Sequence, residues 1–339
     1  MIQNFDIIKI DENNEFIKIK SELRNNNTSE TYLEFLKKLK PNYFYTYLNI
    51  LIPVILLIMI CYGHNSLIFF NTQNLFFNIA IFFSLSFFFG MCFHVLQQAF
   101  HVGIHFELHS NRDINDKISN LIGLFTASEI KEARKIHMLH HRINGTPDDP
   151  ENSYFKTLNF MTLIKFFSGI AIITYALGLL EKKQEKNIDD IKEIRLIDKI
   201  KSFLSFHRIK VIIFHSTIII CNLLYFDNYI LAFSWFYGFI AFYPFFSSLL
   251  NILEHGHPKE VMNNKDFKIS PLNRLFDSSF ISKYIYGSFG ANKHAIHHWD
   301  PTVHHSNMDD VEKFLYNSQI QKDIIQRRIS FFKTLKQLI

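Results

Sequence analysis

The chain has 339 residues, of which 48% are hydrophobic, and its 38 Phe far outnumber its 11 Gly. No Asp, Glu, Lys or Arg occurs from Asn42 to Phe100, and Asp227 is the only such residue from Val211 to Leu253. Such charge-free runs argue against a soluble fold and favour hydrocarbon surroundings. The net charge of +5 needs no nucleic-acid partner, because basic segments beside an anionic membrane surface account for it.

The two charge-free runs are each long enough for a pair of membrane crossings. Residues 1–42, which precede the first run, are mixed and charged, so we expect an N-terminal arm without a cleavable signal peptide. A helix needs about 20 apolar residues to cross the bilayer core. We therefore predict an all-α membrane protein with four transmembrane helices in two hairpins. The predicted spans are residues 45–62, 75–97, 211–226 and 229–250.

The charge distribution predicts how these spans are oriented. Both hairpin turns lack Lys and Arg, whereas the segments outside the spans carry all 36 basic residues, which places those segments and both termini in the cytoplasm. Residues 158–180 are also apolar, but they contain Lys165 and precede a highly charged stretch, so we place them at the membrane interface. The predicted membrane domain is 43–310, followed by a cytoplasmic tail, 311–339.

Three histidine clusters lie just outside the predicted spans. The first box is HVGIH, the second is HMLHH and the third is HAIHH. Residues three and four apart share one face of a helix, so each box is expected to direct its imidazoles at one point. The histidines of the three boxes are His101 and His105, then His137, His140 and His141, then His294, His297 and His298.

Eight convergent imidazoles are more than one tetrahedral zinc ion can use. Neutral imidazole binds Zn, Cu, Fe and Ni well, so the boxes predict a helical cytoplasmic cap that holds two metal ions. A large site without thiolates at a lipid boundary favours iron and oxygen, although spacing alone leaves zinc open. Cys61, Cys92 and Cys221 all fall within predicted spans, where we expect inert core residues.

The order of these motifs resembles the membrane fatty acid desaturase superfamily, which includes desaturases, hydroxylases and ketolases. HVGIHFELHSNRDINDKISNLIG looks like the family's first box with its N-R-x-x-N-D continuation. HMLHHRINGTPDDPE resembles the second box with its acidic tail, ANKHAIHHWDPTV the third, and NILEHGH the extra histidine at the end of the fourth span. The WDP after the third box and the 181–210 segment depart from the common pattern and leave substrate identity open.

The resemblance implies two irons held by nine histidines, with Asn292 near them. It carries the ligand role over to His101, His105, His137, His140, His141, His255, His294, His297 and His298. Second ring N–H groups of such ligands commonly bond carboxylates. Candidates near the boxes are Asp113, Asp116, Asp148, Asp149, Glu254 and Asp300, while His109, His257, His304 and His305 stay undecided.

We expect O₂-dependent desaturation of a lipid acyl chain. Oxidising an unactivated methylene demands a redox metal and O₂, and no dinucleotide-binding fingerprint is evident. Electrons are therefore expected from a separate ferredoxin, rubredoxin or cytochrome b5-type carrier. Hydroxylation or ketolation of a carotenoid or other lipid is the first alternative, and a non-catalytic metal-binding protein or transporter is the second. The lack of HExxH and of paired Glu-x-x-His motifs disfavours a zinc protease and a soluble di-iron bundle.

Overall fold

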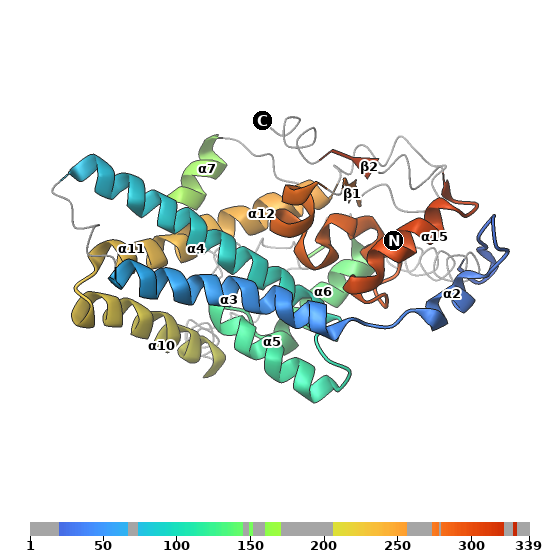
Figure 1. Cartoon of the computed structure of the whole chain (residues 1–339), viewed down its shortest axis with the longest axis horizontal. Helices are drawn as coiled ribbons and strands as arrows, with labels where there is room; N and C mark the ends of the chain where they lie inside the picture. Colours follow the sequence, from blue (N-terminus) through green and yellow to red (C-terminus); the bar gives the residue numbers. More distant parts are fainter. Residues whose placement is uncertain are drawn as a thin grey trace, which may run out of the picture.

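The computed structural model describes residues 20–66, 74–144, 149–151, 160–170, 206–255, 273–277, 279–321 and 328–330. These residues are overwhelmingly helical. They also include two strands of two residues each, β1 (Leu275–Phe276) and β2 (Arg328–Ile329), which pair in parallel. The long helices run side by side, and the short helices α2, α6 and α15 lie toward one end, at the right of the view (Figure 1). The helices from the arm to the second box are α2 (Tyr32–Lys38), α3 (Tyr43–Ser66), α4 (Leu75–Ile104), α5 (Arg112–Thr126) and α6 (Ile130–Ile143).

The later elements include several short π- and 3₁₀-helical turns. They are α7 (Phe160–Phe167), α10 (Phe206–Ile220), η4 (Cys221–Tyr225), α11 (Tyr229–Tyr237), η5 (Gly238–Phe242), α12 (Tyr243–Glu254), η6 (Ile281–Tyr286), η7 (Ser288–Lys293), α14 (His294–Trp299), η8 (His305–Asn307) and α15 (Met308–Tyr316). π-Helical turns are rare and often mark functional sites. Here η5 joins α11 to α12, so the fourth apolar helix continues through it.

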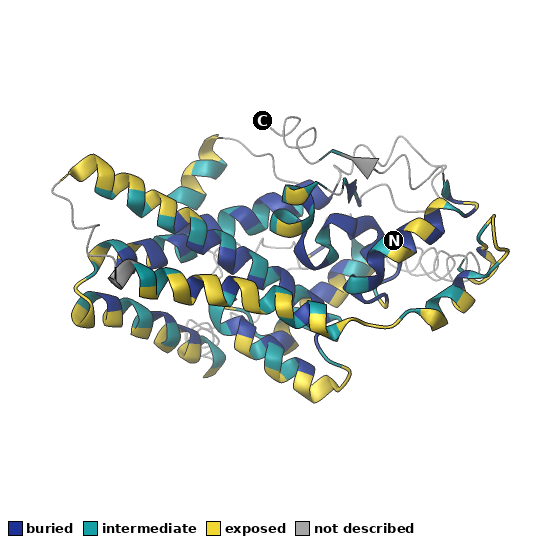
Figure 2. Ribbon diagram, in the orientation of Figure 1, coloured by how far each residue is buried: buried dark blue, intermediate teal, exposed yellow. Residues whose placement is uncertain are grey.

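Four helices are long and apolar enough to cross a membrane, as the sequence predicts. They cover Tyr43–Gly63, Leu75–Ile104, Phe206–Tyr225 and Tyr229–Glu254. Large apolar side chains on their outer faces are exposed, as lipid contact requires (Figure 2). At a rise of 1.5 Å per residue, the second helix is about 45 Å long and the fourth about 39 Å, so both exceed the bilayer core of about 30 Å. His101 and His105 lie at the C-terminal end of the second of these helices, and His255 caps the fourth.

Close backbone contact holds the second and fourth of these helices together. Gly90 of α4 lies against Phe242, and a Cβ added at Gly90 would overlap Phe242 Cβ and approach Tyr243 N to 3.0 Å. On the other helix, a Cβ at Gly238 would lie 2.8 Å from Phe89 Cβ and from Ser86 O. Small residues at both surfaces let membrane helices approach closely. This crossing fixes α4 against the η5 turn.

The helix in the described part of the predicted interfacial segment is too short to cross a membrane. α7 has eight residues, about 12 Å of helix, and its chain turns at Gly169 with a φ of +74°. Phe167 packs on Phe242 and Phe245, and the Tyr237 hydroxyl donates to Phe167 O over 2.7 Å. Residues 171–205, which include most of the 181–210 segment, lie outside the described residues. The interfacial placement stays a prediction.

A second hydrophobic core lies beneath the third box. It joins Leu23 and Tyr32 from the N-terminal arm to Trp299, Phe314 and Leu315. The Tyr32 hydroxyl also donates to Asp300 Oδ2 over 3.1 Å. Residues on both sides of the predicted boundaries at 42 and 310 therefore share this core. The pairing of the spans into two hairpins and the cytoplasmic orientation remain predictions.

Candidate metal centre

Nine histidines from four separate segments meet at one end of the long helices. His101 lies in the last turn of α4 and His105 caps that helix, while His255 caps α12. α6 contributes the second box and α14 the third. The structure therefore brings together all nine histidines that the family resemblance implies, although their role as ligands stays a prediction.

The ring nitrogens form two neighbouring groups. The first group is His101, His105, His137 and His297, and the second is His140, His255, His294 and His298. Within each group the candidate ligand atoms all lie within 4.8 Å of one another. His141 lies beside the first group, with its Nε2 2.9 Å from His137 Nε2 and 3.1 Å from His297 Nε2. Two groups match the predicted number of metal ions.

The expectation that each box directs its rings at one point is wrong for the second and third boxes. His137 belongs to the first group and His140 to the second, and His297 is likewise separated from His294 and His298. Successive residues of a helix point about 100° apart, so positions three and four residues on diverge to either side of the first. Each HxxHH box therefore serves both groups.

Carboxylates hold the outer nitrogens of two second-box rings. His140 Nδ1 lies 2.9 Å from both Oδ1 and Oδ2 of Asp149, and His137 Nδ1 lies 2.9 Å from Glu151 Oε1. A neutral ring that donates its Nδ1–H to a carboxylate presents an Nε2 lone pair on its other side. His140 and His137 therefore offer lone pairs to the second and first groups, which is the usual arrangement of a metal-binding histidine.

Burial keeps seven of the clustered rings neutral. Desolvation, followed by repulsion from neighbouring imidazoles, lowers the pKa of His105, His137, His141, His255, His294, His297 and His298 well below the ordinary value. Neutral imidazole is the form that binds metal. Several Nε2 atoms nevertheless lie 3.1–3.4 Å apart, such as His140 and His255 at 3.4 Å and His294 and His255 at 3.2 Å. Lone pairs that converge this closely fit a shared cation, so the residues suit a pair of metal ions.

The predicted supporting residues divide into those that reach the rings and those that do not. Asp149 contacts His140, and Glu254 Oε1 lies 3.6 Å from His294 Nδ1. Asp113 is in the first turn of α5 and Asp116 pairs with Arg134. Asp148 and His257 lie outside the described residues. Asp300 binds the arm through Tyr32 and Lys20 instead.

Two further observations concern residues that sequence reasoning left open or missed. Asn292 is buried, and its Nδ2 has no hydrogen-bond partner among the described residues. Glu151 was not among the candidate carboxylates, although it lies in the acidic tail of the second box. Its position two residues after Asp149 was the available signal.

Glu107, His304 and His305 form a third buried group. Hydrogen bonds connect its members without a metal ion. His304 Nε2 donates to Glu107 O over 2.8 Å, which leaves its Nδ1 to accept from the Ser306 N–H and hydroxyl. Glu107 Oε2 accepts from His305 N at 2.5 Å and faces His305 Nδ1 at 3.0 Å. His305 Nε2 lies 3.1 Å from Thr46 Oγ1. Since all four ring nitrogens have partners, this group ties the end of the first box to the segment after the third.

The same group shows strong effects of burial on ionisation. Desolvation raises the pKa of Glu107 to about 8 and lowers the pKa of His304 to about 4 and of His305 to about 3. All three groups are therefore neutral near pH 7. His109, in contrast, is half-buried, accepts from Asn111 N over 2.9 Å and belongs to none of the three groups.

Comparison with known proteins identifies one family. The model of the family described as "Fatty acid desaturase" matches residues 77–322, which include all three boxes and His255. No curated protein and no solved structure matches the chain.

Proposed function

Because the chain belongs to the fatty acid desaturase family, we propose that it is an O₂-dependent membrane desaturase that introduces a double bond into a lipid acyl chain. The nine clustered histidines would hold two iron ions. The family supports an oxidoreductase that acts on lipid, and the desaturation outcome is our proposal. The observation that carries it is the convergence of nine histidines, eight of them in two groups of four and His141 beside the first group, at the ends of apolar helices.

The reaction sets what the protein must supply. Removing two hydrogens from adjacent methylenes while O₂ is reduced to two waters consumes two electrons and two protons from outside. The irons would supply the oxidising chemistry that no side chain can provide. A separate ferredoxin, rubredoxin or cytochrome b5-type carrier would deliver the electrons.

The chain's own residues would position the centre. Asp149 and Glu151 orient His140 and His137, because each carboxylate fixes which ring nitrogen carries the proton. Asn292 would complete the site beside the third box. Burial of the second group, in which His140, His255 and His294 are each at most 4% exposed, would keep bulk water away from the reacting carbon.

Helix length supports a lipid substrate. The two longest of the four apolar helices, α4 and the Tyr229–Glu254 helix, both end in candidate ligands. An apolar chain could therefore reach the metals along the bundle without entering water. We place the centre and both termini in the cytoplasm, since the basic residues lie outside the spans. A reporter fused after Ile339 tests this orientation, and activity on the opposite side of the membrane would refute it.

Hydroxylation or ketolation of a lipid remains the alternative within the family, because the same ligands can serve either outcome. The distinguishing experiment expresses the chain, with a reductase and electron carrier, in a host that makes saturated lipids. Mass spectrometry of the lipids then reports the product. Loss of two hydrogens supports desaturation, gain of oxygen supports the alternative, and unchanged lipids with an iron-loaded, reducible protein support a non-catalytic metal-binding role.

Ligand variants connect that product to the centre. His297→Ala removes a ring of the first group and should abolish product formation and lower iron content. His109→Ala is the matched control, because His109 is near the first box in sequence but outside the groups. Unchanged iron and activity in His297→Ala would contradict ligation.

A further inference from the structure

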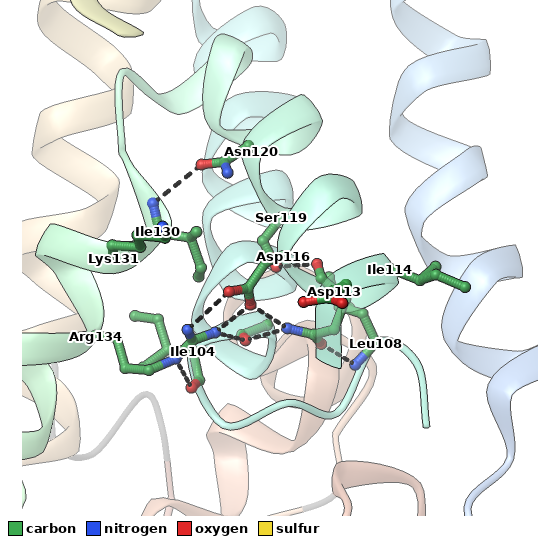
Figure 3. A network of polar contacts seen from close by, with 12 residues as sticks. Ile104, Leu108, Asp113, Ile114, Asp116, Ser119, Asn120, Ile130, Lys131 and Arg134 are labelled. Carbon is green, nitrogen blue, oxygen red and sulfur yellow. Dashed lines mark hydrogen bonds and ion pairs between the residues drawn. The ribbon is translucent and has the colours of Figure 1, made fainter. Parts of the chain in front are cut away.

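The residues that follow the first box form a network that the proposed chemistry does not use. Asn115 and Asp116 lie on α5, at the end of the N-R-x-x-N-D stretch. Figure 3 shows Asp116 beside Arg134 and Ile104 at the C-terminal end of α4. Asn115 Nδ2 donates to Gly103 O over 2.8 Å, and its Oδ1 accepts from Leu108 N at 3.0 Å. Both bonds involve backbone groups of residues that lie within five positions of His105 in the sequence. The stretch therefore holds the end of the first-box helix.

Arg134 of α6 reaches the same helix end from the other side. Its Nε donates to Ile104 O over 2.8 Å and its Nη2 to Gly103 O over 3.1 Å. The guanidinium also forms a bidentate pair with Asp116, at 2.6 Å to Oδ1 and 3.1 Å to Oδ2 (Figure 3). Its Cζ lies 3.8 Å from the centre of the Phe106 ring. One side chain thus joins α4, α5 and α6.

The physical basis is the unsatisfied end of an α-helix. The last carbonyls of α4 have no partner within the helix, and a cation is favoured at this negative end. Phe106 has a φ of +63° and its N–H donates to Gly103 O over 3.2 Å, while the turn leaves Ile104 O to Arg134. A planar guanidinium can bind two carbonyls and a carboxylate together, whereas a lysine ammonium cannot match this geometry.

The position of Arg134 links the first two boxes. Arg134 lies three residues before His137, about one helical turn, and it contacts Ile104, the neighbour of His105. His101, His105 and His137 all belong to the first group. The second group takes no residue from α4. The clamp formed by Arg134, Asp116 and Asn115 therefore fixes the end of α4, which serves only the first group, against α6, which serves both.

We propose that Arg134 is a positioning residue that sets the first metal group by fixing the end of α4 against α6. This proposal rests on the proposed two-iron centre. Asp116 holds the guanidinium in place from α5, and Asn120 Oδ1 accepts from Ile130 N over 3.2 Å, which ties the start of α6 to the same helix. The first box and the second box are thereby held at a fixed separation.

The test compares Arg134→Met with Arg112→Met in the full-length protein loaded with ⁵⁷Fe. Arg112 is the matched control, because its guanidinium also lies over Phe106, at 4.8 Å, without a hydrogen bond to α4 in the described residues. Iron per chain and Mössbauer spectra are measured on monodisperse protein. We expect Arg134→Met to lose iron selectively, retaining about one ion per chain with one spectral component unchanged, while Arg112→Met keeps both.

Arg134→Lys keeps the positive charge beside Asp116 but loses the planar guanidinium that binds the two carbonyls and the carboxylate together. It should bind iron at the first group about 10- to 100-fold more weakly than wild type, the usual effect of losing a supporting residue. Two unchanged spectral components in Arg134→Met, or equal loss of both, would overturn the positioning role. Absence of iron from the wild-type protein would instead refute the proposed centre itself.

Discussion

Asp149 offers the sharpest test of how supporting carboxylates act on the second group. Its side chain is fully buried, and both oxygens lie 2.9 Å from His140 Nδ1. Oδ1 also accepts from Glu151 N at 2.8 Å. Asp149→Asn keeps the shape and one acceptor but removes the charge that stabilises the Nδ1–H tautomer. The predicted consequence is weaker metal binding at the second group.

The magnitude follows from the burial of this pair. Loss of such a supporting residue typically lowers metal affinity by about 10- to 100-fold, or about 1.4–2.7 kcal/mol. Because Asp149 is screened from solvent, Asp149→Asn should fall at the upper end of this range. Glu151 makes the corresponding contact to His137, but its side chain is 29% exposed. Water can replace part of its effect, so Glu151→Gln should fall at the lower end.

Competition with a calibrated chelator measures both affinities on the same preparation. Asp149→Asn should weaken one of two binding events, and Glu151→Gln should weaken the other to a smaller extent. Equal effects, or a larger effect of Glu151→Gln, would refute the argument that burial sets the strength of these contacts.

Two further predictions concern packing and ionisation. Gly90→Ala should destabilise the protein by about 1–3 kcal/mol, because the added Cβ would overlap Phe242 and η5 must move. Gly63→Ala, with nothing within 4 Å of the added Cβ, should be neutral or slightly stabilising. Thermal unfolding midpoints measured by size exclusion in detergent compare the two variants, and equal midpoints would contradict the packing argument. Folding raises the Glu107 pKa to about 8, so the folded protein keeps a proton on Glu107 that the unfolded chain has lost. The stability that this proton contributes is lost as the pH rises toward 8. Glu107→Gln should therefore gain stability relative to metal-free wild type between pH 6.5 and 8, by up to about 1.4 kcal/mol per pH unit, and thermal midpoints that run parallel across this range would count against the raised pKa.

Much of the fold and of the candidate site was predictable because it depends on local pattern. Charge-free runs predicted the four apolar helices, and the i,i+4 spacing of the first box and i,i+3,i+4 spacing of the other two predicted metal-binding histidines. His255 has no such spacing, and only the family resemblance identified it. The division into two groups could not be predicted, since it depends on how α4, α6, α12 and α14 pack together.

The supporting residues were harder to predict for the same reason. Arg134 precedes the second box and Glu107 follows the first, but each acts on a segment distant in the sequence. Arg134 reaches carbonyls 30 residues earlier, and Glu107 meets His305 198 residues later. A basic or acidic residue beside a histidine box carries no local sign of such a partner. The π-helical turn at η5 likewise follows from packing against α4.

The shared core beneath the third box also bears on the order of biogenesis. Leu23 and Tyr32 lie more than 280 residues before Phe314 and Leu315 in the chain. The platform under α14 therefore cannot close until the segment that carries Phe314 and Leu315 has been synthesised. Completion of the second group, to which α14 contributes His294 and His298, is expected to follow that step.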